Sequence, residues 1–280
     1  MTGYLQILGA VAIWAFFNGV LVKWTRTSGL GVGAWTGFVG LVLMTVIFIV
    51  SDVHFSLSKY QIIMVVHLLV AAALNNACYY TAIKMAGVAN AALFHYLAPM
   101  LVIVWNVLIP QFYAPVSVYH LFALLLGLAG IIYVGMPNLK GSKLWMLFGL
   151  GSAVFYSLEI VLSGYVMGDL KVPVEIATFG KLFGQAVLMS VIALIANERL
   201  SVESRNDWRK LIWGGVLLYL SFELYFEGSK TVGDLERGIL GYIDRIGAIA
   251  LGAYVFKEKL TKNILVGGAL IIGASVLLFF

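Results

Sequence analysis

The sequence predicts an all-α polytopic membrane protein with ten transmembrane helices, arranged as two inverted five-helix repeats. Of its 280 residues, 62% are hydrophobic and 11% are charged, whereas soluble domains average about 45–50% apolar and about 25% charged residues. The apolar residues fall into runs of about 20, the length of helix that crosses about 30 Å of hydrocarbon. Strands of membrane barrels are about half as long and alternate in hydropathy, which argues against a β-barrel.

Ten apolar runs follow one another along the chain, separated by short polar loops, and we expect one helix in each. The runs are Gly3–Val22, Val32–Val50, Gln61–Ile83, Ala89–Ile109, Val116–Val134, Leu144–Met167, Val174–Ala196, Leu211–Glu227, Leu235–Phe256 and Lys262–Phe280. The first run has no basic segment before it and no small-residue cleavage site, so it is expected to be a spanning helix and not a signal peptide.

An internal repeat divides the chain into a first unit, residues 1–139, and a second unit, residues 140–280. A shift of 146 residues aligns Tyr79–Lys84 with Tyr225–Lys230 and pairs Tyr96 with Tyr242. A shift of about 141 residues aligns the first apolar run with the sixth. Because each unit has an odd number of helices, the two units enter the bilayer from opposite sides. This inverted-repeat plan places a binding site near the midplane, between the repeats.

Lysine and arginine are distributed unevenly between alternate loops. The loops after the odd-numbered helices contain 12: Lys23, Arg26, Lys84, Lys140, Lys143, Arg199, Arg205, Arg209, Lys210, Lys257, Lys259 and Lys262. The opposite loops contain 3: Lys59, Lys171 and Lys230. Since basic loops stay in the cytoplasm, we expect an inner-membrane protein of a prokaryote with both termini outside. The basic loops would contact anionic lipid headgroups, and nothing here indicates a nucleic-acid partner.

Ionisable side chains lie at membrane depth mainly in the second unit, whereas their counterparts in the first unit are mostly uncharged. Such groups are costly in hydrocarbon, so they pair with one another or line a pathway. The residues expected to contact substrate are Glu159, Lys181, Glu223, Asp244 and Arg245, and Glu227 is expected to act in gating or coupling. Four acids against two bases favour a ligand with a cationic part. The alternative is a set of ion pairs that joins the eighth and ninth helices.

The first unit offers mainly neutral polar and aromatic groups to the predicted site. An aromatic lining around a few polar groups is typical of small-ligand cavities. The residues expected to form it are Trp14, Asn18, Asn76, Tyr79, Tyr80, His95 and Tyr96, joined by Tyr156 and Tyr242 of the second unit. For the aromatic residues the alternative is packing, and for His95 it is a hydrogen bond between helices. Pro99 lies in the middle of the fourth run, where it predicts a kink or gate.

Signatures of enzymes are missing from the sequence. There is no phosphate-binding glycine loop, no paired-histidine zinc spacing and no Gly-x-Ser-x-Gly motif. The single cysteine, Cys78, allows neither an intrachain disulfide nor a thiolate metal site. We therefore expect no catalytic residue, no metal and no cofactor. Without an ATP site, transport would be driven by a gradient.

Two groups of motifs carry a family resemblance. The first is Ala82-Ile83-Lys84, Ala89-Asn90-Ala91 and Leu97-Ala98-Pro99, and the second is Glu258-Lys259-Leu260 with Gly267–Gly273. With them the chain resembles the drug/metabolite transporter superfamily, in its ten-helix EamA-like branch. The resemblance implies a cavity lined by helices one, three, four, six, eight and nine, and export of amino acids or other small metabolites. It often implies cytoplasmic termini as well, contrary to the charge count.

Two positions depart from the family pattern. Ile109-Pro110-Gln111 stands where an acidic residue usually follows helix four, and Asp244-Arg245 stands where a Glu-Pro or similar pair is usual. The second departure puts charge where the family commonly has a proline. Substrate therefore cannot be inferred from better-known members.

Together these patterns predict a secondary transporter, an exporter of amino acids or related amines that works by alternating access. Glu159, Glu223 and Asp244 would hold the cationic group, and Arg245 or Lys181 a carboxylate. The alternatives are a carrier for a neutral or anionic solute, and a non-transporting membrane scaffold or accessory subunit. The expected partners are the small-molecule substrate, membrane lipid and the proton as coupling ion, with the protein a monomer or homodimer.

Overall fold

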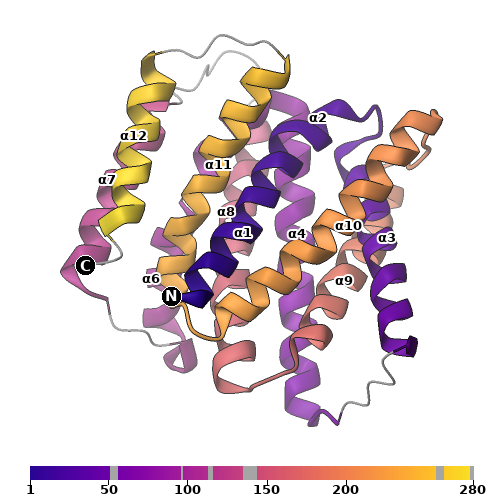
Figure 1. The fold of residues 1–280 in the computed structure, drawn as a ribbon, viewed down its shortest axis with the longest axis horizontal. Coiled ribbons are helices and arrows are strands. Elements are labelled where there is room, and N and C mark those ends of the chain that lie inside the picture. The colour runs from indigo at the N-terminus through magenta and orange to yellow at the C-terminus, as the bar shows by residue number, and fades with distance from the viewer. Residues whose placement is uncertain (51–55, 96, 113–115, 135–143, 257–261, 278–280) are drawn as a thin grey trace.

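The computed structural model describes residues 1–50, 56–95, 97–112, 116–134, 144–256 and 262–277, and all regular structure among them is helical (Figure 1). The helices are α1 (Thr2–Phe16), η1 (Phe17–Leu21, a π-helix), α2 (Val22–Trp24), α3 (Gly29–Val50), α4 (Lys59–Ala86), α5 (Val88–His95), α6 (Ala98–Leu108), η2 (Pro110–Phe112, a 3-10 helix), α7 (Val118–Val134), α8 (Leu144–Gly164), η3 (Tyr165–Asp169, a π-helix), α9 (Val174–Ile195), α10 (Arg205–Ser229), α11 (Asp234–Phe256) and α12 (Lys262–Val276). The predicted all-helical class is confirmed.

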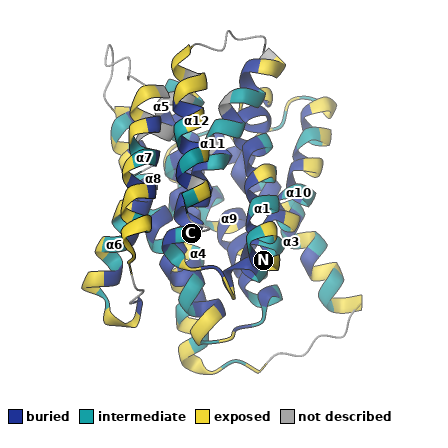
Figure 2. Ribbon diagram, turned by 60° about the vertical axis from the view of Figure 1, so that its left-hand side comes forward, coloured by how far each residue is buried: buried dark blue, intermediate teal, exposed yellow. Residues whose placement is uncertain are grey.

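Several helices have the length and composition of membrane spans. In the described part of the chain, six stretches are long and apolar enough to cross a bilayer: Thr2–Trp24, Gly29–Val50, Lys59–Ala86, Leu144–Asp169, Val174–Ile195 and Asp234–Val255. Shorter apolar helices cover Ala98–Leu108, Val118–Gly130 and Leu265–Ala274. Large apolar side chains such as Phe38, Val46 and Phe122 point outward, and exposed residues follow the outer helix faces (Figure 2). This arrangement suits hydrocarbon surroundings.

The fourth apolar run contains a break. α5 ends at His95 and α6 begins at Ala98, so Pro99 lies in the first turn of α6, where its missing N–H removes no helical hydrogen bond. The turn at Leu97 precedes Pro99, whereas the sequence analysis expected a kink or gate at Pro99 itself. α11 runs without a break through Asp244 and Arg245.

Small residues let the central helices approach one another closely. α4 packs against α8 and α9, α1 against α10 and α11, and α3 against α9. A Cβ added to Gly37 of α3 would lie 2.7 Å from the backbone nitrogen of Ala186 in α9, so this contact needs glycine. α7 and α12 pack on each other at one edge of the bundle (Figure 1).

Polar contacts gather several loops on one face of the bundle. The Lys210 ammonium donates to the carbonyl oxygen of Trp24 at 3.0 Å, and Lys84 donates to that of Thr25 at 3.1 Å. The indole N–H of Trp35 donates to the carbonyl oxygen of Leu200 at 2.7 Å. The loops that follow α2 and α9 therefore meet at the end of α4, as expected for loops on the same side of a membrane.

Candidate functional site

A polar pocket lies inside the bundle, where α1, η1, α4, α5 and α8 to α11 approach one another. Its lining residues are Trp14, Asn18, Asn75, Asn76, Tyr79, Tyr80, His95, Tyr156, Glu159, Lys181, Leu218, Phe222 and Asp244. Its free volume is about 30 Å³, which is room for about two water molecules. We call this the central pocket.

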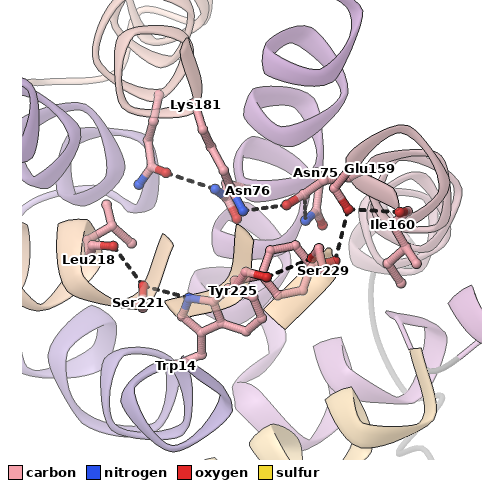
Figure 3. A network of polar contacts seen from close by, with 12 residues as sticks. Trp14, Asn75, Asn76, Glu159, Ile160, Lys181, Leu218, Ser221, Tyr225 and Ser229 are labelled. Carbon is pink, nitrogen blue, oxygen red and sulfur yellow. Dashed lines mark hydrogen bonds and ion pairs between the residues drawn. The ribbon is translucent and has the colours of Figure 1, made fainter. Parts of the chain in front are cut away.

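A buried ion pair forms one wall of the central pocket. Lys181 of α9 contacts Glu159 of α8, and their side chains are only 3% and 1% exposed. Asn75 of α4 donates from Nδ2 to Oε2 of Glu159 at 2.9 Å (Figure 3). The Lys181 ammonium also lies 3.9 Å from the ring centroid of Phe222, where the negative face of the ring favours a cation. Both charges thus have partners within the protein.

A second acid enters the pocket from another helix. Asp244 of α11 is fully buried, and its Oδ1 accepts a hydrogen bond from Nδ2 of Asn18 at 3.3 Å. Asn18 belongs to the π-helix η1, and such segments occur often at functional sites. The indole of Trp14, one turn earlier, donates to the hydroxyl of Ser221 at 2.9 Å (Figure 3).

His95 is held between aromatic rings. Its ring centroid lies 4.5 Å from that of Tyr156 and 4.6 Å from that of Tyr79. Nδ1 lies 3.0 Å from the hydroxyl of Ser152, which itself donates to the carbonyl oxygen of Gly149. Because that hydroxyl has one proton to give, we assign the hydrogen to Nδ1 of His95. His95 thus lines the pocket and also joins α5 to α8.

Comparison with known proteins decides the family. The model of the EamA-like transporter family matches residues 1–136 and again residues 143–280. The chain belongs to this family. A relative from Archaeoglobus fulgidus, described as an uncharacterized transporter, is 32% identical over 206 residues, 73% of this chain and 72% of the relative. The resemblance predicted from the sequence is confirmed, and this EamA-like protein is a transporter integral to a membrane.

A solved structure extends the comparison to the fold. The structure, titled only as the crystal structure of a protein, superposes with a TM-score of 0.79 over 99% of this chain and 98% of its own. The two sequences are 19% identical, so the similarity shows a shared fold and carries no functional information.

Most of the residues expected to bind substrate in this EamA-like transporter line the central pocket. They are Trp14, Asn18, Asn76, Tyr79, Tyr80, His95, Tyr156, Glu159, Lys181 and Asp244. The side chain of Arg245, and Tyr96 as a whole, lie outside the described residues.

Four other predicted residues lie away from the pocket. The side of α10 that faces the central pocket carries Leu218 and Phe222. Glu223 lies about 100° further round the helix, near Thr178 and Glu175 of α9. Glu227 pairs with Lys230 at 2.8 Å, with both side chains more than 40% exposed.

Tyr242 is buried beside Gly127 of α7 and does not line the central pocket, whereas Asp244 on the same helix does. Pro99 of α6 lies against Gly238 of α11, where a Cβ added to Gly238 would be 3.3 Å from Cγ of Pro99. The expectation that Glu223 and Tyr242 share a cavity with Asp244 is therefore not met.

Two polar residues, Asn75 and Arg237, were not among those predicted to bind substrate. Asn75 lines the pocket. The sequence indicates this through the spacing of four residues between Asn75 and Tyr79, which places both on one face of α4. Arg237 is 1% exposed within α11. It lies seven residues, or about two turns, before Asp244, and so on the same helix face.

Proposed function

We propose that this transporter is a gradient-driven carrier of amino acids or related amines, which bind in the central pocket. The observation that supports this most is the presence of both charge signs in one buried cavity, Asp244 on α11 and the Glu159–Lys181 pair on α8 and α9. In this proposal Asp244 holds the ammonium group of the solute. Lys181 exchanges its contact with Glu159 for the solute carboxylate, and Trp14, Tyr79 and Tyr156 shape the cavity.

The acidic groups of the lining favour a cationic group on the solute. Glu159 and Asp244 reach the central pocket from two different helices, α8 and α11. Carboxylates in a buried cavity attract an ammonium group and repel an anion.

The size of the pocket supports alternating access. About 30 Å³ does not hold an amino acid, so the helices around the pocket have to move apart before a solute binds. We propose ten spanning helices in two inverted units, residues 1–139 and 140–280, rocking about this pocket. The two separate matches of the family model support this division. Export across the inner membrane, with the proton as coupling ion, completes the proposal.

Ligand-dependent stability of the purified protein tests the proposal. Amino acids and amines are expected to raise the melting temperature, because a ligand that binds only the folded state stabilises it. Asp244→Asn is expected to weaken amine binding about 10- to 100-fold, the equivalent of about 1.5–3 kcal/mol for a hydrogen bond to a charged group. Uptake into proteoliposomes then measures transport of the ligands found.

The control variant is Glu227→Gln, which lies outside the pocket and is expected to leave binding unchanged. If no amine or amino acid stabilises the protein, or if Asp244→Asn binds them normally, the proposal is wrong. Stabilisation by anions alone, lost in Lys181→Gln, would instead establish an anion carrier. Stabilisation by neutral solutes alone would establish a carrier for those.

A further inference from the structure

Arg237 is the largest of the completely buried side chains that the structure describes. Its Nη1 donates to the hydroxyls of Ser163 at 2.6 Å, Ser229 at 2.8 Å and Tyr225 at 3.3 Å. Its Nη2 donates to the carbonyl oxygen of Ile160 at 3.1 Å and contacts the carboxylate of Asp234. One guanidinium therefore ties α8 and α10 to α11.

Two partners of this arginine, Ser229 and Asp234, line a second cavity of about 270 Å³. We call it the outer cavity. Its lining residues are Gln111, Phe112, Val161, Gly164, Tyr165, Asp169, Ser229, Lys230, Thr231, Val232, Gly233 and Asp234. The side chain of Asp234 is 15% exposed while that of Arg237 is fully covered, so Asp234 forms part of the cavity wall and Arg237 lies behind it. Unlike the central pocket, the outer cavity has room for a small metabolite.

Three helices show the same order along their length: residues of the central pocket, then Arg237 or its contacts, then residues of the outer cavity. Along α11, Asp244 lines the central pocket, Arg237 follows two turns away, and Asp234 lines the outer cavity. Along α8 the sequence is Glu159, then the Arg237 contacts Ile160 and Ser163, then Gly164.

α10 repeats this order. Phe222 lines the central pocket, Tyr225 and Ser229 contact Arg237, and Ser229 also lines the outer cavity. Arg237 and its partners therefore lie between the two cavities.

Tyr225 completes this layer on its inner side. Its ring centroid lies 5.1 Å from that of Trp14 and 5.3 Å from the Lys181 ammonium, both of which line the central pocket. Figure 3 shows Tyr225 next to Trp14 on one side and Ser229 on the other. Tyr225 and the arginine bonded to it therefore lie between the outer cavity and Lys181.

We propose that Arg237 and Asp234 are the gate between the outer cavity and the central pocket. The proposal rests on the proposed transport function only in that a solute crosses here. Because all the bonds from Arg237 end on α8, α10 or α11, movement of α8 away from α10 and α11 breaks several of them together. Asp234 and Asp169 face the outer cavity, so an ammonium group arriving there competes with Arg237 for the Asp234 carboxylate and favours opening.

Gly164 shows how tightly the gate is built. A Cβ at this position of α8 would collide with the side chains of both Asp234 and Arg237. Gly164 thus leaves room for the ion pair, which a side chain at this position would displace.

Thiol labelling in sealed vesicles of known orientation tests the gate without a known substrate. In a Cys78→Ser background, Thr231→Cys reports the side on which the outer cavity opens. Leu218→Cys reports access to the central pocket. A membrane-impermeant cationic thiosulfonate is expected to label Leu218→Cys slowly from the Thr231 side. Adding Arg237→Ala or Asp234→Asn is expected to raise that rate at least ~10-fold, and from that side only.

Control variants separate gating from loss of structure. Lys230→Gln breaks an exposed ion pair at the rim of the same cavity and is expected to leave the rate unchanged. Ser163→Ala with Ser229→Ala removes two bonds of Arg237 while keeping its charge paired, and serves if Arg237→Ala does not fold. Unchanged rates in the gate variants, or equal increases from both sides, would overturn the proposal. Faster labelling without any solute transport would leave the gate standing and refute the proposed function.

Discussion

Lys181 and Glu159 are each other's main electrostatic partner at a deeply buried position. Removing two charges from water costs several kcal/mol per ion, and only close pairing offsets this. Asn75 donates a further hydrogen bond to the Glu159 carboxylate, and the Phe222 ring lies against the Lys181 ammonium. A single charge left at this position would have no comparable partner among the described residues.

A double-mutant cycle tests this view. Glu159→Gln and Lys181→Gln are each expected to lower the free energy of unfolding by about 3–5 kcal/mol, because each leaves the other charge buried alone. The double variant is expected to be more stable than either single one. The measurement is the melting temperature of all four proteins in one detergent.

The Glu227–Lys230 pair offers a matched control, because both of its side chains are over 40% exposed. The same cycle at this pair is expected to change stability by less than about 1 kcal/mol per variant. A double variant of Glu159 and Lys181 that loses the full sum of the two single losses would show that the charges do not interact.

The sequence predicted much of the pocket but not its whole outline. Buried charge identified Glu159, Lys181 and Asp244, because such groups seldom occur at membrane depth without a role or a partner. Glu223 carries the same signal, and only its place on the face of α10 that turns to α9 separates it from the pocket. Arg237 was left out of the predicted site because it lies nearer the membrane edge than Asp244, and its serine partners resemble ordinary small packing residues.

At the scale of the elements, close helix contacts depend on single glycines. Gly37 brings α3 against the backbone of α9. Similarly, a Cβ on Gly130 of α7 would lie 2.7 Å from the carbonyl oxygen of Gly267 in α12. In a bilayer these contacts carry packing energy, because lipid supplies little hydrophobic force between helices.

Gly37→Val is expected to destabilise the protein by about 1–3 kcal/mol, since the added atoms force α3 away from α9. The measurement is the melting temperature relative to the unmodified protein. Phe38→Leu, next in sequence but half exposed, is the control and should have little effect. Equal effects of the two substitutions would show that the α3–α9 distance does not limit stability.

Some elements could not be predicted from the sequence. α10 begins at Arg205, six residues before its apolar run, because the Ser204 side chain caps it by accepting from the backbone N–H of Asp207. The π-helices η1 and η3 have no residue signature comparable to proline or a glycine cap. The ten-helix inverted repeat stays a prediction.

At the scale of the whole molecule, basic residues mark one face. Lys84 and Lys210 bind carbonyl oxygens near the end of α2, and the backbone of Arg199 accepts from Ser28 at 3.4 Å. From the distribution of positive charge we expect this face to be cytoplasmic. Thr231 and the outer cavity would then open on the other side.

Labelling at two positions tests the orientation. In a Cys78→Ser background, Glu203→Cys on the basic face is expected to react with an impermeant reagent only in inside-out vesicles. Thr231→Cys should show the opposite pattern. The reverse result would place both termini in the cytoplasm, as the family often has them, and the charge count would then be a poor guide to this protein.

The order of charges along α11 has an electrical consequence. From the outer cavity inward, a free ion meets an acid at Asp234, a base at Arg237 and an acid at Asp244. Coulomb interactions are strong where water is scarce, so the proposed gate, while its ion pair is closed, would stop inorganic ions of either sign together with the solute. A carrier gated this way would keep the membrane potential from leaking between transport cycles.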